Sequence, residues 1–357
     1  MSRQEDWEVV VTTARADRHP HLLVGKVTAA YRRAARSWGP HVLPPAPPLT
    51  ACLRDGRGST RLPGGKRVRT RPSATGVGRD PAPAARPRPT GVLGSAGMDL
   101  QLTGLRALVT GGTRGIGRGI AQRLVEEGCA VAVCARDADA VAATVDELRG
   151  VGATAWGDAV DVADDAALER FVEQAAGALG GLDLVVANAG GSAGAPALED
   201  TAGEDWRRTF DLNAVHAAVL VRAALPHLRR SRAASVLVVA SVSGSRPQPK
   251  AQYAAAKAAE ISLAASLGRE LGGDGVRVNS LSPGSILFDG GSWDRRRQDD
   301  PAAFAAFAER EFPRGRLGTV AEVADVAAFL LSPRAGWVSG TDVVVDGAQN
   351  APGMAGY

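Results

Sequence analysis

The sequence predicts an α/β fold, in which a doubly wound parallel sheet is covered by helices on both faces in three layers, α/β/α. Short apolar runs of strand length alternate with helical stretches over residues 105–346. These runs are continuously apolar, as in strands buried on both faces of a parallel sheet. A glycine-rich turn at residues 110–117 joins the first run to the first helical stretch, and phosphate-binding turns of such sheets occupy that position.

The expected elements follow one another regularly. Strands are expected at residues 105–110, 130–135, 153–159, 182–187, 235–240, 276–281 and 342–346. Helices are expected at residues 115–127, 138–149, 164–179, 204–228, 250–271 and 320–331. This alternation implies right-handed crossovers, and ligands of such sheets bind beyond the carboxyl ends of the strands, where the strand order reverses.

Residues 1–97 differ in composition from the rest of the chain. They hold 17 Lys and Arg against 6 Asp and Glu, whereas residues 98–357 hold 25 against 32. The segment is rich in Pro and Arg, and proline disfavours helix and sheet. We interpret it as upstream sequence with Met98 as the natural start, or as a disordered extension. A transit peptide is a third alternative, which the acids near the beginning disfavour. A single folded domain is expected at residues 98–350.

Composition excludes several classes of function. Because the basic excess belongs to residues 1–97, the folded domain shows no sign of nucleic-acid binding. Cys52, Cys129 and Cys134 lack metal-ligand spacing, so we expect neither disulfides nor a bound metal, and a reducing, cytoplasmic location. No apolar run reaches the length of a membrane span, so no membrane partner is expected.

The glycine-rich turn predicts a dinucleotide site. Glycine permits a sharp turn and a close approach to a pyrophosphate, and the first N–H groups of the following helix point at the anion. The cofactor contacts expected here are Gly111, Thr113, Arg114, Gly115, Ile116 and Gly117.

The end of the second expected strand indicates which nicotinamide cofactor binds. An acid at that point binds the ribose of NAD(H), whereas a base accepts the 2′-phosphate of NADP(H). Ala135 stands at the acid position, and Arg136 follows it. With Arg114 it could bind the phosphate through charge-assisted contacts, so NADP(H) is predicted over NAD(H). Asp161 and Val162, after the third expected strand, could meet the adenine.

Tyr253 and Lys257 lie four residues apart at the beginning of an expected helix. Residues at this spacing share one face, so the phenol and the ammonium lie together. A free phenol titrates near pH ~10, and a nearby positive charge favours the phenolate. Tyr253 could then act as a general acid or base. Ser241, at the end of the preceding strand, could hold the substrate oxygen.

These motifs together resemble the short-chain dehydrogenase/reductase family. They are residues 110–117, the run Ala187-Asn188-Ala189-Gly190, and Asn213, Ser241, Tyr253, Lys257 and Pro283-Gly284. The resemblance implies a Rossmann-type fold, Tyr253 as the acid/base, and Lys257 on the nicotinamide ribose. It implies that Ser241 polarises the carbonyl and that the Asn213 backbone holds a relay water. It also implies that Asn188, Ala189, Gly190, Pro283 and Gly284 line the cofactor, with Ile286 offering backbone groups to its carboxamide.

The chain departs from the family pattern at two positions. Ala187 stands where Asn is usual, and Phe288 stands where many members have a Thr shortly after Pro-Gly. Residues 285–316 interrupt the alternation with glycines and aromatic residues, which predicts a lid over an apolar substrate site, with Trp293 in the pocket.

The function predicted from these residues is an NADP(H)-dependent oxidoreductase for a carbonyl or secondary alcohol, with a 3-oxoacyl compound as one candidate substrate. An NAD-linked alcohol dehydrogenase and a non-catalytic cofactor sensor are the alternatives. The resemblance implies a homotetramer or homodimer.

Overall fold

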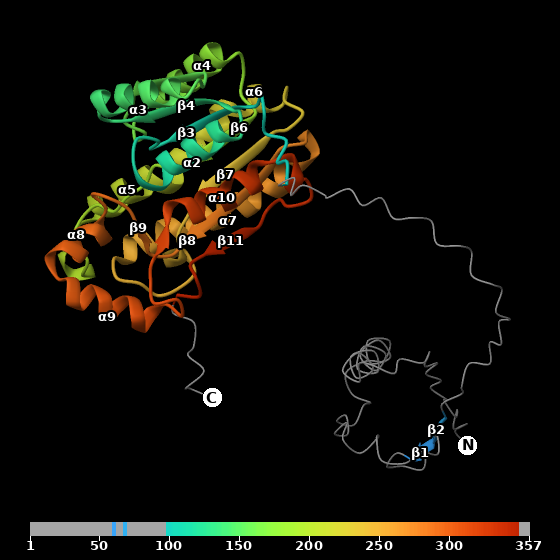
Figure 1. The fold of residues 1–357 in the computed structure, drawn as a ribbon, viewed down its shortest axis with the longest axis vertical. Coiled ribbons are helices and arrows are strands. Elements are labelled where there is room, and N and C mark those ends of the chain that lie inside the picture. Colours follow the sequence, from blue (N-terminus) through green and yellow to red (C-terminus); the bar gives the residue numbers. More distant parts are fainter. Residues whose placement is uncertain (1–58, 62–66, 70–97, 350–357) are drawn as a thin grey trace, which may run out of the picture. The chain divides into compact units, whose positions relative to one another are not determined.

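A seven-stranded parallel sheet runs through the body of the chain (Figure 1). The structure, a computed structural model, describes residues 59–61, 67–69 and 98–349. The strands are β3 (Arg106–Thr110), β4 (Ala130–Ala135), β5 (Ala155–Ala159), β6 (Leu184–Ala187), β7 (Ser235–Val239), β8 (Arg277–Pro283) and β11 (Asp342–Val345). The predicted fold class is therefore confirmed, and the expected strand positions match to within a few residues.

The strand order is β11-β8-β7-β6-β3-β4-β5, and every neighbouring pair is parallel. Within this sheet the path begins at β3 and proceeds to β4 and β5 on one side of it. It then crosses back to β6, which lies on the other side of β3. The order thus reverses between β3 and β6. The loops that follow these two strands diverge, and they leave a crevice at their carboxyl ends.

Helices cover both faces of the sheet. α2 (Gly115–Glu126), α3 (Ala138–Gly150) and α10 (Val320–Leu331) pack on one face, and α4 (Asp165–Leu179), α6 (His216–Leu228) and α7 (Ala251–Glu270) on the other. Strand side chains alternate between the two cores: Ala107 and Val109 point to the first and Leu108 to the second. This explains why the inner strands are largely apolar, because nearly all of their residues meet a helix layer, whereas the edge strands β5 and β11 keep exposed residues such as Asp158 and Val344.

The expected helix at 204–228 is not a uniform α-helix. It divides into α5 (Gly203–Phe210), a π-helical segment η3 (Asp211–Val215) and α6. The buried amide of Asn213 donates to the carbonyl of Thr209, 2.6 Å away, and so uses an acceptor that a regular helix reserves for backbone. The wider turn follows from this competition, and such π segments are frequent at functional sites.

Residues 285–316 form a small helical excursion. β9 (Ile286–Leu287) pairs with β10 (Gly318–Thr319), and α8 (Ser292–Asp299) and α9 (Pro301–Glu311) lie between them. Trp293 stacks on Phe307 with ring centroids 4.5 Å apart. The excursion therefore has an apolar cluster of its own, to which Trp293 belongs. The expectation that Trp293 lies in the substrate pocket stays a prediction.

Short 3-10 turns complete the body: η2 (Leu198–Asp200), η4 (Val242–Gly244), η5 (Leu271–Asp274) and η6 (Pro333–Ala335). In the described residues before Met98, β1 (Ser59–Arg61) pairs antiparallel with β2 (Arg67–Arg69). The proline-rich composition does not predict this ribbon. The interpretations of the rest of residues 1–97 lie outside the described residues. None of the described helices has the length and apolar character needed to cross a membrane.

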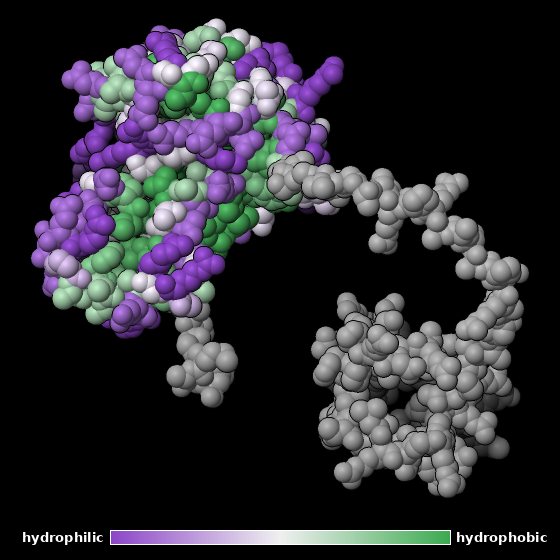
Figure 2. All heavy atoms as spheres, viewed as in Figure 1, coloured by the Kyte–Doolittle hydropathy of each residue, from purple (hydrophilic) through white to green (hydrophobic). Residues whose placement is uncertain are grey.

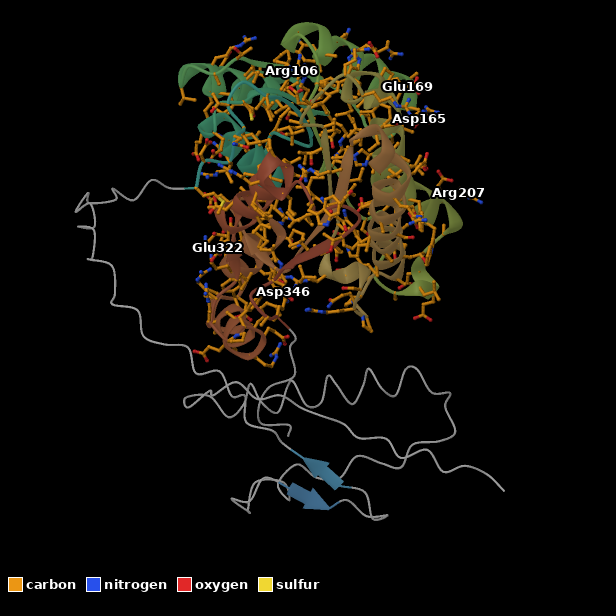
Figure 3. All side chains as sticks on the ribbon, turned by 90° about the vertical axis from the view of Figure 1, so that its right-hand side faces the viewer. Arg106, Asp165, Glu169, Arg207, Glu322 and Asp346 are labelled. Carbon is orange, nitrogen blue, oxygen red and sulfur yellow. The ribbon has the colours of Figure 1, made fainter. Side chains whose placement is uncertain are left out.

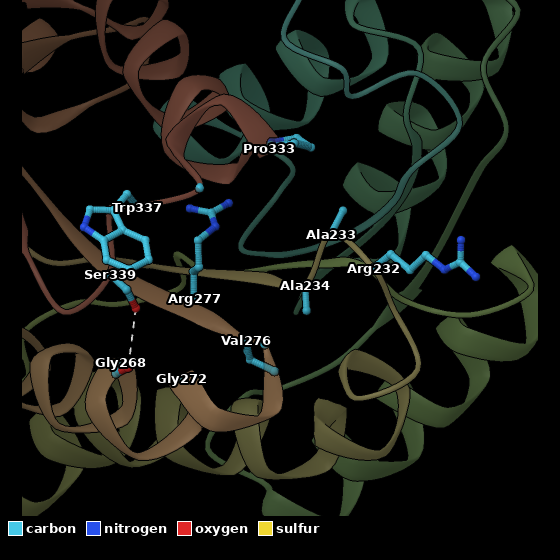
Figure 4. A pocket seen from close by; sticks show the side chains of 12 residues that line it. Arg232, Ala233, Ala234, Gly268, Gly272, Val276, Arg277, Pro333, Trp337 and Ser339 are labelled. Atoms are coloured by element: carbon cyan, nitrogen blue, oxygen red, sulfur yellow. Dashed lines mark hydrogen bonds between the residues drawn. The ribbon is translucent and has the colours of Figure 1, made fainter.

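Ion pairs and hydrogen bonds close the amino-end edge of the sheet. Arg106 donates to the buried carboxylate of Asp183, which joins β3 to the beginning of β6. Arg277, at the start of β8, donates to the carbonyls that end α10, including Leu330 and Leu331, beside a hollow rimmed by the exposed Trp337 (Figure 4). Figure 3 shows Arg106 and Asp346, which follows β11, at opposite ends of the body. The predicted ligand site lies at the carboxyl ends of the strands, which is the end of the body that carries Asp346.

Polar side chains cover the surface over α3 and α4, whereas apolar ones gather over α10, α7 and β11 (Figure 2). Exposed apolar side chains in this region include Phe329 on α10 and Val344 on β11.

Candidate active site

A cleft of about 1120 Å³ opens at the carboxyl ends of β3, β4 and β6, where the strand order reverses. The predicted site residues that line it are Gly111, Thr113, Arg114, Gly115, Ile116, Gly117, Arg136, Asp161, Val162, Asn188, Ala189, Gly190 and Tyr253. The structure thus brings together segments that lie up to 142 residues apart in the chain, from Gly111 to Tyr253. The loop of residues 191–194 also lines the cleft and forms its rim.

The glycine turn has the geometry that an anion site needs. Gly111 and Gly115 have φ angles of +64° and +53°, which disfavour other residues. A Cβ at Gly117 would lie 2.3 Å from both the Asn188 amide nitrogen and the Gly111 carbonyl, so no side chain fits there. No side chain caps the amino end of α2, and its first turn holds no acid. Its N–H groups are therefore free to bind a pyrophosphate.

Asn188 and Thr110 join the glycine turn after β3 to the loop that follows β6. The Asn188 side chain donates to the carbonyls of Thr110 and Gly111, at 2.9 and 3.1 Å. The Thr110 hydroxyl accepts from the backbone N–H groups of Asn188 and Ala189. These bonds tie the end of β6 to the glycine turn.

The end of β4 is basic and exposed. Arg136 and Arg114 both line the cleft, and within the described residues neither guanidinium has an ion pair or hydrogen bond. Asp137 accepts from the N–H groups of Asp139 and Ala140 and so caps α3. Both bonds use the Oδ1 of Asp137, which stands two residues after the acid position at Ala135. Asp137, Asp161 and Val162 line the same cleft as the two arginines.

Tyr253 and Lys257 lie on the first turns of α7. The Lys257 Nζ lies 5.7 Å from the centroid of the Tyr253 ring. Tyr253 lines the cleft, whereas Lys257 is 3% exposed and lies behind it. Its ammonium donates to the Val239 carbonyl, 2.9 Å away at the end of β7, and lies 2.8 Å from the Glu260 carboxylate.

Asn213 is buried on the π segment. Its side chain donates to the Gly191 carbonyl at 2.7 Å, which fastens the rim of the cleft. A Cβ at Gly190 would lie 2.6 Å from the Asn213 Oδ1 and 3.2 Å from the Lys257 Nζ. Gly190 is therefore the thin wall that separates both side chains from the cleft.

His216 occupies the layer behind Asn213. Its ring nitrogens lie 2.9 Å from the Asn213 carbonyl and 3.2 Å from the Thr110 hydroxyl. Burial, together with the nearby Lys257 ammonium, lowers the pKa of His216 to about 4. A neutral ring can accept from the hydroxyl and donate to the carbonyl, and this arrangement holds the π segment against β3.

Ser241 follows β7 and begins the turn η4. Its hydroxyl oxygen accepts from the N–H of Ser243 at 3.1 Å, which leaves its own proton available. η4 packs on α7 so closely that a Cβ at Gly244 would lie 2.7 Å from the Lys257 carbonyl carbon. The predicted serine, tyrosine and lysine therefore belong to one packed unit.

The remaining predicted cofactor residues lie outside the lining of the cleft. Pro283 ends β8, and the N–H of Gly284 donates to the Val345 carbonyl. Gln349 accepts from the N–H of Ser285 at 2.8 Å, so the C-terminal segment supports this loop. Ile286 is buried in β9. Their contacts with a cofactor stay predictions.

One residue at the site was not predicted from the sequence, and another was noted only as a departure from the family pattern. The second is Phe288, whose ring lines the cleft and lies against the glycine turn, since a Cβ at Gly115 would come within 2.8 Å of it. Glu260 is fully buried beside Lys257. A carboxylate three residues after Lys257, between the buried Ala256 and Ala264, was the signal available in the sequence.

The described residues contain no group of three or more His, Cys, Asp or Glu side chains that could hold a metal ion. Cys129 and Cys134 are buried free thiols, and burial raises the pKa of each to about 12. Cys52 lies outside the described residues.

We expect Gly117→Ala to weaken cofactor binding at least tenfold and to destabilise the protein by about 1–3 kcal/mol, as overpacking does. The new methyl group would displace Asn188 or the turn itself. Thermal denaturation and cofactor titration measure both effects. Gly177→Ala is the matched control, because Gly177 lies on α4 with open space around it. A Gly117→Ala protein that binds cofactor normally would contradict this account of the turn.

Known proteins were compared with the chain. A family model described as enoyl-(acyl carrier protein) reductase matches residues 111–349. The isoepoxydon dehydrogenase patN of Penicillium expansum is 37% identical over 69% of this chain and 95% of its own length.

Two solved structures have the same fold. The short-chain dehydrogenase of Burkholderia cenocepacia in complex with NADP has a TM-score of 0.63 and 33% identity, and the match covers 70% of this chain and 100% of that one. The 7α-hydroxysteroid dehydrogenase complexed with NADH and 7-oxo glycochenodeoxycholic acid has a TM-score of 0.65 and 31% identity, over 70% and 96%.

Proposed function

Because the chain belongs to the short-chain dehydrogenase/reductase family of oxidoreductases, we propose that Tyr253 serves as general acid/base in hydride transfer between NADP(H) and a carbonyl or secondary alcohol. The observation that carries the proposal is the Tyr253–Lys257 pair, which lies at the cleft that the glycine turn helps to form. The relatives include one bound to NADP and one bound to NADH and an oxo steroid, so the cofactor class and the reaction type agree with this assignment.

A dinucleotide fits the residues of the cleft. Gly111, Gly115 and the uncapped start of α2 would hold its pyrophosphate, and Ala189 and Gly190 would lie along its nicotinamide half. When bound, the cofactor supplies or accepts the hydride. Arg114 and Arg136 favour NADP(H) over NAD(H), because two exposed guanidiniums without a partner among the described residues suit a 2′-phosphate. The acid position at the end of β4 is held by Ala135, and the nearby Asp137 caps α3 through its Oδ1.

The side chains would divide the proton chemistry among them. The Tyr253 hydroxyl donates its proton to the carbonyl oxygen during reduction and recovers it during oxidation. The Lys257 ammonium stabilises the phenolate by its positive charge. Ser241 donates its free hydroxyl proton to the same substrate oxygen. Asn213 holds the rim of the cleft, and its buried position behind Gly190 places it beside Lys257.

A panel of substrates tests the proposal. Ketones, 3-oxoacyl thioesters and oxidised sugars are each offered with NADPH and with NADH, and oxidation of the cofactor is followed by absorbance. We expect turnover with at least one carbonyl class, faster with NADPH. Cofactor binding without turnover on any compound would instead favour a cofactor-sensing protein, and faster turnover with NADH would favour an NAD-linked alcohol dehydrogenase.

We expect a shortened chain that begins at Met98 to fold and to turn over like the full chain. The body is anchored close to this point, because Arg334 donates to the Asp99 carbonyl and the side chains of Leu100 and Leu102 are buried. Circular dichroism and cofactor oxidation compare the two forms. An insoluble or inactive shortened chain would show that residues 1–97 contribute to the fold.

A further inference from the structure

We propose that Glu260 is a positioning residue that sets the pH range over which Tyr253 and Lys257 work. This inference rests on the proposed function, since it assigns a role to a group behind the acid/base pair. Glu260 is not among the residues that line the cleft, and it is fully buried, so a substrate cannot touch it. It acts through Lys257.

The Glu260 carboxylate is buried together with the Lys257 ammonium, which is unusual for a charged group. Glu260 is 0% exposed and Lys257 is 3% exposed. The Lys257 Nζ lies 2.8 Å from the Glu260 Oε2. Neither carboxylate oxygen has a well-oriented hydrogen bond from the described residues. The ammonium is therefore the one group that compensates this buried charge within the described part of the chain.

Packing does not account for a carboxylate at this position. The other buried residues on this face of α7 are Ala256, Ala264 and Gly268, which have no polar side-chain atoms, and Gln252, whose amide is satisfied by the carbonyls of Ala193 and Ala195. A buried ion pair commonly contributes no more to stability than apolar residues of the same size, because desolvating both charges cancels their attraction. The carboxylate thus brings no clear advantage to the fold, and its close partner is the lysine of the proton-transfer pair.

Glu260 and the Val239 carbonyl together orient the ammonium. An ammonium has three N–H donors. One is directed to Val239 on β7, and a second faces Glu260. The third remains for the cleft side, where Gly190 forms the thin wall. In this arrangement, the carboxylate prevents Lys257 from turning away from Tyr253 and the cofactor.

Glu260 also keeps Lys257 charged. Burial works against the charged form of Lys257, but attraction to Glu260 and Tyr253 outweighs it, so the pKa of Lys257 is raised. Burial raises the pKa of Glu260 as well, and the ion pair opposes that rise. We treat the pair as charged, because the ammonium has a carboxylate at 2.8 Å and a carbonyl at 2.9 Å to receive its protons.

Few other titratable groups act on the pair. Tyr253 lies on the same helix, and His216 on α6 is neutral near pH 7 because its pKa is about 4. On β11, Asp342 accepts from the hydroxyls of Ser280 and Ser282 on β8. Replacing Glu260 by a neutral residue therefore removes the negative charge nearest to Lys257.

The sign of the effect follows directly. A negative charge favours the protonated forms of both the phenol and the ammonium. Its removal lets both groups lose their protons at lower pH. Oxidation of an alcohol needs the Tyr253 phenolate and the charged Lys257. The acidic limb of the pH–rate profile therefore reports deprotonation of Tyr253, and the alkaline limb reports deprotonation of Lys257. We expect Glu260→Gln to move both limbs to lower pH, the alkaline limb by about 1–2 units.

The experiment compares pH–rate profiles of the full chain with those of Glu260→Gln, Glu260→Met and Glu260→Asp. The first two remove the charge and are expected to shift both limbs in the same direction, while Glu260→Asp keeps the charge and should restore the limbs largely to their original positions. Glu270→Gln is the matched control, because Glu270 is exposed at the end of the same helix. Thermal denaturation shows whether each variant is folded.

A second readout needs no turnover. The chain holds three tyrosines, so ultraviolet absorbance follows phenolate formation, and subtracting the titration of Tyr253→Phe isolates Tyr253. In Glu260→Gln the Tyr253 phenolate should form at lower pH than in the unmodified chain.

The proposal would be overturned if Glu260→Gln and Glu260→Met fold and yet keep both limbs of the pH–rate profile and the pH of phenolate formation unchanged. This holds even where turnover falls. If the unmodified chain shows no turnover at all, the proposed function fails, and the absorbance titration still decides the role of Glu260.

Discussion

Tyr253→Phe is expected to lower kcat by about 10²–10⁴-fold, the usual contribution of a positioned general acid or base. The phenylalanine ring can keep its place beside Lys257, because the change removes only the hydroxyl group. The substrate oxygen then has no proton donor on α7, and Ser241 cannot replace it, since an alcohol is a far weaker acid than a phenol. Affinity for the cofactor should change little.

Steady-state kinetics with the best carbonyl compound of the panel measure the loss, and fluorescence titration measures cofactor affinity. The titration is the internal control, because a misfolded variant would lose binding as well as turnover. Near-normal kcat in Tyr253→Phe would refute the assignment of the acid/base. An equal loss of binding and turnover would point to a structural role for the hydroxyl.

Replacing both Arg114 and Arg136 by Ala is expected to weaken NADPH binding by about 10²-fold, with little effect on NADH. Hydrogen bonds to charged groups contribute about 1.5–3 kcal/mol each, and exposure of both side chains to solvent reduces this contribution. The 2′-phosphate is the feature that distinguishes the two cofactors, so a loss confined to NADPH identifies these arginines as its partners.

Dissociation constants for both cofactors, measured in the two single variants and the double variant, check this expectation. Arg118→Ala is a suitable control, because Arg118 also lies on α2 but pairs with Glu147 on α3. Equal losses for NADPH and NADH would show that the arginines stabilise the cleft and do not select the phosphate. The salt dependence of NADPH affinity should also fall in the double variant.

The proposed chemistry depends on two layers of the molecule. The front layer lines the cleft and holds Tyr253 together with the glycine turn. The back layer holds Lys257, Glu260, Asn213 and His216, all at most 3% exposed. Buried charge in the back layer can act on the phenol without competition from water, because electrostatic interactions strengthen where solvent is excluded. Catalytic tuning is thus assigned to residues that substrates do not touch.

Much of the fold could be predicted from the sequence because its signals are local. Continuous apolar runs of four to seven residues became the strands of the sheet. The cap of α4 is also a local feature, because aspartate favours the N-cap position and the Asp164 side chain accepts from the Ala167 N–H. The glycine turn was also local, since Gly111 and Gly115 need the backbone freedom that glycine provides.

Other features could not be predicted because they depend on what a residue meets across the fold. Trp293 stacks on Phe307 of the next helix. Phe288 stands near the usual Thr position in the chain, and its ring reaches the glycine turn. Neither partner is close enough in sequence, or regular enough in spacing, to be deduced from a pattern.

By itself, then, the sequence determined the order of strands and helices, the phosphate-binding turn and the pairing of Tyr253 with Lys257, because each depends on neighbours within one or two turns of the chain. Only the tertiary structure decided the π segment at Asn213, the neutral His216 and the buried partnership of Lys257 with Glu260. The physical reason is that a side chain's charge and hydrogen bonds depend on burial, and burial is settled when distant segments pack against one sheet.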